Sequence, residues 1–333
     1  MRRLTPPMPR DAGGTITIND GTGPIRTMLS TGDLLFVYKA DKTFKVETPE
    51  TIDPKRTNPS APFVVSAVEN IGCSHWIVAR VLLQGYEMLN SCSVSQEEKT
   101  AICKQLYKCR ESRVRCESVA VRVAARVDAI EKLVQQAGEN VLRGRVLTNF
   151  PQVENLELDC TTFLSEANRA IKAISGLPRL LLRLEKTDNN FDHLLNRLKH
   201  KVGANETPTR FIESVAPNAR RLVDMRNSLE HPEGKKKTLI KNFHLAPDGK
   251  MCTPIWSLSC DSPAPIGEDM HRAIEFLVST AEKLLIELIV FRERDRFEYV
   301  VQEIVSEQID QSFPIKYKLM VYFKPPKNKP LSR

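Results

Sequence analysis

Three polar residues near the end of a predicted helix, Arg226, Asn227 and His231, combine the side-chain types needed to hold an anion beside an imidazole. Asn227 and His231 are four residues apart, so in a helix the amide can orient the imidazole. Arg226 and Glu230 have the same spacing and can pair. At this spacing Arg226 and His231 lie about 140° apart around the helix, so they do not share one face, although they could line two sides of a groove where this helix meets a second copy of itself.

The sequence around these residues also carries local positive charge. Between residues 220 and 241 there are seven basic and three acidic residues. Pro232 disfavours the helical conformation at His231 and therefore predicts that the helix ends there, at the negative end of the helix dipole. We expect the basic side chains to bind the phosphates of RNA. The predicted RNA-binding residues are Arg220, Arg221, Lys235, Lys236 and Lys237.

The segment Arg226-Asn227-Ser228-Leu229-Glu230-His231 resembles the Arg-Asn-x-x-x-His signature of the HEPN superfamily, the small α-helical domains of many prokaryotic RNase toxins and antiviral effectors. The resemblance covers roughly residues 150–295, where the order of predicted helices is also similar. It implies metal-independent RNA cleavage at a homodimer interface, without a cofactor. In that mechanism His231 handles the proton of the 2′-hydroxyl or the leaving group, Arg226 stabilises charge on the scissile phosphate, and Asn227 positions them.

Two other interpretations remain open for the same residues. Many HEPN proteins keep the helices but serve as protein-interaction or nucleotide-binding modules, and the hairpin predicted at residues 238–259 could cover the groove. Arg226 and His231 could also be an Arg–Glu surface pair and a histidine at a helix end. The enzyme hypothesis describes a stress or phage-defence toxin that acts on RNA and has an antitoxin or another protein partner. Glu233 stands where toxins modified by a partner nucleotidyltransferase have tyrosine, so we do not expect that regulation.

The composition is typical of a globular protein. The chain has 333 residues, of which 41% are hydrophobic and 27% charged, enough for about two domains. No apolar run is long enough to cross a membrane and no secretory signal is present, so we expect a cytoplasmic protein without membrane contact. The eight cysteines contain no C-x-x-C pair, which predicts reduced thiols and no metal site. The chain ends, residues 1–10 and 324–333, supply seven units of the net charge of +8.

The periodicity predicts a mainly α fold with an inserted β-hairpin, preceded by a small β element and two long helices. The resemblance implies that the helices around the motif form a HEPN-like helical bundle. Four regions are expected. They are residues 1–62 with a β-hairpin and a linker, residues 63–148 with helices, residues 149–295 with the HEPN-like domain and its hairpin at 238–259, and residues 296–333 with a helix, a strand and a basic tail.

Individual elements follow from the same patterns. We expect strands at residues 15–18, 34–38, 43–47 and 315–323, and a linker at 49–62. Pro217 should either kink the segment that begins at residue 207 or restart the helix after it. Helices are predicted from residue 64 to residue 86, at 95–136 with Ser95 as N-cap, at 156–175, from an Asp188 cap to residue 202, at 218–230, at 267–294 and at 297–309.

Overall fold

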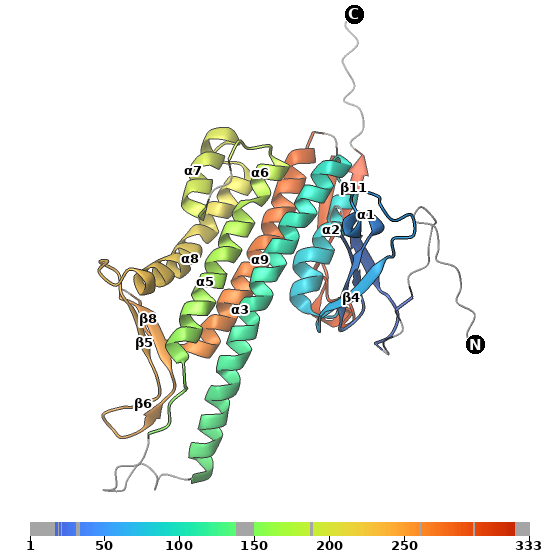
Figure 1. Cartoon of the computed structure of the whole chain (residues 1–333). Helices are drawn as coiled ribbons and strands as arrows, with labels where there is room; N and C mark the ends of the chain where they lie inside the picture. Colours follow the sequence, from blue (N-terminus) through green and yellow to red (C-terminus); the bar gives the residue numbers. More distant parts are fainter. Residues whose placement is uncertain are drawn as a thin grey trace, which may run out of the picture. The chain divides into compact units, whose positions relative to one another are not determined.

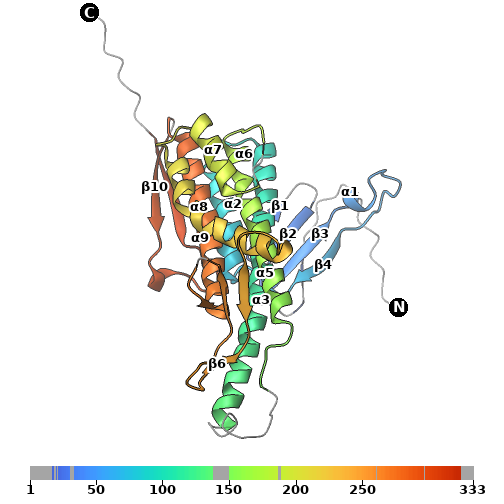
Figure 2. The ribbon, with the colours of Figure 1, turned by 90° about the vertical axis from the view of Figure 1, so that its left-hand side faces the viewer.

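The computed structural model of the chain describes residues 17–18, 20, 22–30, 34–137, 150–186, 189–259, 261–295 and 297–323 (Figures 1 and 2). The chain forms two compact units. Unit 1 contains residues 1–106 and 293–333, and unit 2 contains residues 107–292. The divisions fall inside helices α3 (Gln96–Ala137) and α9 (Ile266–Glu293).

The prediction of a mainly α chain is wrong. About 53% of the described residues are helical and 16% are in strands, and these strands form four sheets, so the fold has mixed α and β character. Two segments that were expected to be helical are strands, β4 (Val64–Glu69) and β10 (Phe297–Glu303). Both are rich in valine, a β-branched residue that favours the extended conformation.

Unit 1 contains a four-stranded antiparallel sheet with the order β1-β2-β3-β4. Strands β2 (Leu34–Tyr38) and β3 (Thr43–Glu47) form the predicted hairpin, and β1 (Thr27–Ser30) and β4 are the edges. One face of the sheet packs around Val37, Phe44 and Val46, all of which are buried. The expected strand at residues 15–18 is not a strand at residues 17–18, and its other half lies outside the described residues.

The remaining elements of unit 1 lie at both ends of its sequence. A second sheet pairs β10 with β11 (Tyr317–Phe323), which replaces the helix expected at residues 297–309 and confirms the last strand. The side-chain oxygen of Gln84 accepts hydrogen bonds of 2.7 Å from the backbone N–H groups of Lys316 and Tyr317 and so fixes the start of β11. The other elements are α1 (Pro49–Ile52), the π-helix η1 (Val78–Leu83), α2 (Gln84–Asn90), the start of α3, and the 3-10 helix η2 (Ser306–Gln308).

Helices form most of unit 2. The predicted helix bounds are confirmed at α3, whose start in unit 1 is capped by reciprocal hydrogen bonds of 3.1 Å between Ser95 and Glu98, and at α5 (Leu156–Ser175) in unit 2. Asn190 caps α7 (Phe191–Lys201), while the predicted cap Asp188 lies outside the described residues. Pro217 lies inside one continuous helix, α8 (Thr207–Glu230), so the predicted restart of the helix at residue 218 is wrong. A short helix, α6 (Leu177–Leu181), follows α5.

The helices of unit 2 pack around a core of aliphatic side chains and a buried aromatic pair. Figure 1 shows α5 running alongside α3, where Arg122 of α3 forms a 2.5 Å ion pair with Asp159 of α5. Phe163 of α5 and Trp256 are both fully buried, with ring centroids 6.0 Å apart. No helix in the described part of the chain has both the length and the apolar character required to cross a bilayer.

The predicted hairpin after α8 is confirmed. Strand β5 (Thr238–Lys241) pairs with β8 (Ile255–Leu258), and β6 (His244–Leu245) pairs with β7 (Met251–Cys252) around the expected turn. Strand β9 (Ala264–Pro265) joins the other side of β8 and leads into α9. Trp256 of β8 anchors this sheet in the core of unit 2, so the end of α8 and the hairpin are held by the same packing.

Candidate active site

Helix α8 ends where the sequence predicts. The backbone N–H of His231 donates a 2.8 Å hydrogen bond to the carbonyl of Asn227, and His231 itself has left the helical conformation, with φ −129° and ψ 73°. Pro232 follows and disfavours a helical residue before it. The imidazole of His231 is exposed at this end of the helix.

Arg226 is held by its neighbours on α8. Its guanidinium lies 2.5 Å from a carboxylate oxygen of Glu230 and donates a 3.1 Å hydrogen bond to the side-chain oxygen of Asn227. The Arg226 side chain is 29% exposed, and its buried Nε has no hydrogen-bond partner among the described residues. The predicted Arg–Glu pair is therefore present, and it is joined to the amide that follows in the sequence.

A groove of about 350 Å³ lies against the end of α8 and the turn that follows it. Asn227, His231 and two of the predicted RNA-binding lysines are in its wall, and Arg226 is outside it. This separation is expected from the 140° between Arg226 and His231 around a helix. The residues that line the groove are Asp224, Asn227, Ser228, His231, Gly234, Lys235 and Lys236.

The three predicted lysines differ in their partners. Lys236 forms a 2.5 Å ion pair with Asp224, so its charge in the groove is partly neutralised. Lys235 and Lys237 are exposed, and neither ammonium group forms an ion pair with any residue described in the structure. The backbone N–H of Lys237 donates a 3.1 Å hydrogen bond to the Ser259 hydroxyl, which fixes the chain between α8 and β5.

Arg220 and Arg221, adjacent in the sequence, have different surroundings. Arg220 is on the surface and binds both carboxylate oxygens of Asp192, which holds the pKa of Asp192 below its ordinary value. Arg221 donates hydrogen bonds of 2.9 Å to Asp261 and to Asp269, and Asp269 also accepts one of 2.7 Å from the Trp256 indole N–H. Both arginines thus face carboxylates of unit 2 and lie outside the groove.

Two residues that line the groove, Asp224 and Ser228, are not among the predicted site residues. Asp224 and Ser228 line the groove because they are on the same face of α8 as Asn227 and His231. Ser228 is buried, and its hydroxyl lies 2.6 Å from that of Thr238 at the start of β5. The helical spacing of Asp224, at i−7 from His231, was the available signal for the first of these residues.

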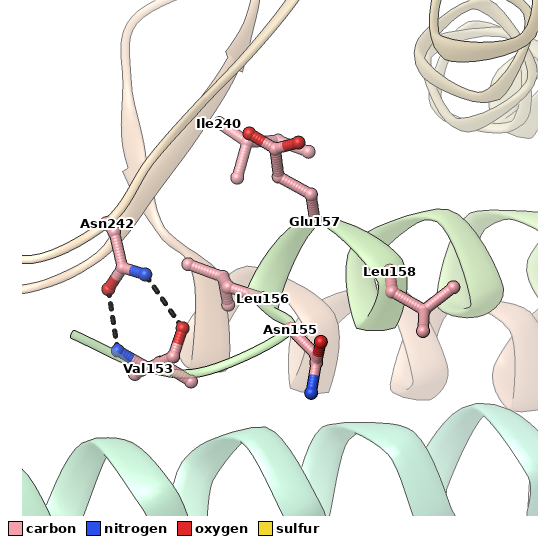
Figure 3. A pocket seen from close by; sticks show the side chains of 7 residues that line it. All are labelled: Val153, Asn155, Leu156, Glu157, Leu158, Ile240 and Asn242. Carbon is pink, nitrogen blue, oxygen red and sulfur yellow. Dashed lines mark hydrogen bonds between the residues drawn. The ribbon is translucent and has the colours of Figure 1, made fainter.

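A larger hollow of about 440 Å³ lies where α5 begins, beside the hairpin. Figure 3 shows Asn242 of the hairpin facing the backbone of Val153. The Asn242 amide accepts a 3.0 Å hydrogen bond from the Val153 N–H and donates one of 2.8 Å to the Val153 carbonyl. Glu157 is the only ionisable residue among the described residues that line this hollow. The hollow therefore lacks a second acid or base to pair with Glu157 in catalysis.

Within the part of the chain that the structure describes, no group of three or more His, Cys, Asp or Glu side chains could hold a metal ion. The groove at the end of α8 instead joins an exposed imidazole, an amide and ammonium groups. Such a set can bind a phosphate and move a proton beside it. Comparison with known protein families, with curated proteins and with solved structures found no match for this chain.

Proposed function

We propose that unit 2 is a metal-independent endoribonuclease that acts as a homodimer, as its resemblance to the HEPN signature implies. The observation that carries the proposal is that Asn227, His231, Lys235 and Lys236 line one open groove at the end of α8. An anionic backbone can approach the exposed imidazole there, and the ammonium groups attract its phosphates.

The proposed reaction is an internal phosphoryl transfer. His231 takes the proton of the ribose 2′-hydroxyl, the 2′-oxygen forms a bond to phosphorus, and the bond from phosphorus to the 5′-oxygen breaks. The leaving 5′-oxygen takes up a proton, so the products are a 2′,3′-cyclic phosphate and a 5′-hydroxyl. Arg226 stabilises the charge that grows on the phosphate oxygens, and Asn227, which accepts a hydrogen bond from Arg226 of the same copy, positions that guanidinium.

In this mechanism the Arg226 guanidinium of one copy of the chain acts in the groove of a second copy. Arg226 is outside the groove of its own copy, on a neighbouring face of α8. A dimer with two-fold symmetry across the end of α8 brings the same surface of each copy against the other. Each groove then uses His231 of one copy and Arg226 of the other.

The first experiment measures cleavage of a single-stranded RNA in the presence of EDTA. We expect His231→Ala to slow cleavage about 10²–10⁴-fold, the range for removal of a general acid or base. The matched controls are His271→Ala and Arg272→Ala, because both side chains are exposed on α9 and each has a glutamate four residues away. Both controls should cleave at the wild-type rate. Cleavage that survives His231→Ala, or that requires a divalent metal ion, contradicts the proposal.

A mixing experiment tests the composite site. Arg226→Ala and His231→Ala homodimers are each inactive in this account. After equal mixing and exchange of subunits, half of the dimers are mixed, and each mixed dimer has one complete site, so about a quarter of the wild-type activity should return. No recovery would mean that Arg226 and His231 of one copy act together. Absence of cleavage at every protein concentration, with a stable complex in pull-downs, would instead favour the interaction module.

A further inference from the structure

Another hollow, distinct from the one at the start of α5, adjoins the groove in unit 2. It has a volume of about 230 Å³ and lies between α5, α7 and α8. Asp224 and Asn227 line both this cavity and the groove with His231, so a ligand in the groove can extend into the cavity. The residues that line the cavity are Ile171, Asn190, Phe191, Asp192, Ala216, Ala219, Arg220, Val223, Asp224 and Asn227.

The cavity has an apolar interior and a polar rim. Ile171, Phe191, Ala216 and Ala219 are buried. Small sites of this kind bind a flat apolar ring through their walls and fix its orientation through a few polar groups. The volume is below the ~300–1,000 Å³ that is typical of drug-sized ligands, so the cavity suits a single ring system.

The rim has a defined pattern of hydrogen-bond donors and acceptors. The side-chain oxygen of Asn190 accepts a 2.8 Å hydrogen bond from the backbone N–H of His193, and that of Asn227 accepts the bond from Arg226. Each amide therefore keeps its NH₂ group to donate to a ligand. The carboxylates of Asp192 and Asp224 only accept hydrogen bonds. Arg220 contacts both oxygens of Asp192, whereas Lys236 contacts only one oxygen of Asp224, so Asp224 is the better acceptor for a ligand.

We propose that this cavity receives the base of an RNA nucleotide next to the cleaved phosphate and selects guanine; the proposal rests on the proposed function. Guanine offers two acceptors, O6 and N7, to the amide NH₂ groups, and donors at N1 and N2 to a carboxylate. A carboxylate can accept two parallel N–H groups at once, which adenine, cytosine and uracil do not present in this arrangement. Unpaired bases of single-stranded RNA are free to enter such a cavity.

The test measures the binding of the four ribonucleoside 3′-monophosphates by calorimetry, and maps the cleavage sites on an unstructured RNA. Wild type should bind the guanosine nucleotide about tenfold more tightly than the other three, the discrimination expected of one good bidentate contact. Val223→Trp fills the cavity from a partly exposed position on α8 and should remove this preference, in binding and in cleavage. Val215→Trp is the control, because Val215 is also partly exposed on α8 but lines neither hollow.

The outcomes separate the two proposals. Binding of the four nucleotides within twofold of one another overturns the guanine cavity, and His231-dependent cleavage in the same preparation would leave the nuclease standing. Guanosine binding that is lost in Val223→Trp supports the cavity even if no RNA is cleaved, and in that case only the nuclease fails. A preference that is unchanged in Val223→Trp, with Val215→Trp equally folded by circular dichroism, overturns the cavity.

Discussion

Arg220 and Arg221 are adjacent in the sequence, but we predict that their replacement by alanine lowers the stability of unit 2 by unequal amounts. Arg221 is 28% exposed and donates hydrogen bonds to two carboxylates, whereas Arg220 is 52% exposed and pairs with Asp192 on the surface. Removal of Arg221 also leaves Asp269, which is only 15% exposed, with the Trp256 indole and the distant Arg272 as its remaining polar contacts among the described side chains.

The expected magnitudes follow from these contacts. A hydrogen bond to a charged group contributes about 1.5–3 kcal/mol. Since Arg221 is partly exposed, we take less than the sum of two such bonds and expect Arg221→Ala to lower the free energy of unfolding by about 2–3 kcal/mol. A surface ion pair contributes about 0–1 kcal/mol, and we expect no more than this from Arg220→Ala.

Urea unfolding followed by tryptophan fluorescence measures both variants. The chain has two tryptophans. In a Trp76→Phe background, the signal comes from Trp256, which is fully buried in unit 2 and bonded to Asp269. The midpoint should fall in Arg221→Ala without a change in the slope of the transition. Equal midpoints for the two variants, or a larger loss in Arg220→Ala, would refute the assignment of Arg221 to the structure of unit 2.

Three further outcomes are expected. Asn242→Ala should lower the stability of unit 2 by about 1–3 kcal/mol, because the backbone of Val153 loses both hydrogen bonds, and thermal unfolding beside Asn242→Asp, which keeps only the accepting oxygen, checks this. Hydrogen bonding to Lys39 lowers the pKa of Asp20, so its stabilisation of unit 1 is present above the unfolded pKa of about 3.9 and is lost as the pH falls through the folded value. Asp20→Asn should lack this stabilisation even at neutral pH, so its acid unfolding should differ from that of wild type. An acid unfolding transition identical to that of wild type would contradict the prediction. Burial raises the pKa of the Cys103 thiol to about 11 and that of Cys160 to about 12, so a thiol reagent at pH 8 should leave both unmodified in the folded protein, and fast reaction of either would be inconsistent with the structure.

The sequence predicted those elements whose signals are local. The cap at Ser95, the helix from Leu156 to Ser175 and the stop before Pro232 each depend on residues within one or two turns of the helix. The hairpin at residues 238–259 was found from its turn residues and flanking apolar runs. These signals require no knowledge of distant parts of the chain.

The secondary-structure predictions are wrong where the conformation of a segment depends on residues that are distant in the sequence. Residues 297–303 form a strand because they pair with residues 317–323, and a short apolar run does not distinguish a helix from a strand by periodicity alone. In the candidate site, Arg221 donates hydrogen bonds to Asp261 and Asp269, 40 and 48 residues away, which the local sequence does not indicate; its role in RNA binding stays a prediction. The net charge of a segment, counted from the sequence, therefore overestimates the number of cationic side chains that are available to a ligand.

The measurement that tests the central claim most directly is an analysis of RNA ends. Purified wild type and His231→Ala are incubated with a single-stranded RNA in EDTA, and the fragments are examined for 2′,3′-cyclic phosphates and 5′-hydroxyls. We predict that wild type produces both ends and that His231→Ala produces neither above background. Intact RNA with wild type, or the same fragments from both proteins, would contradict the account.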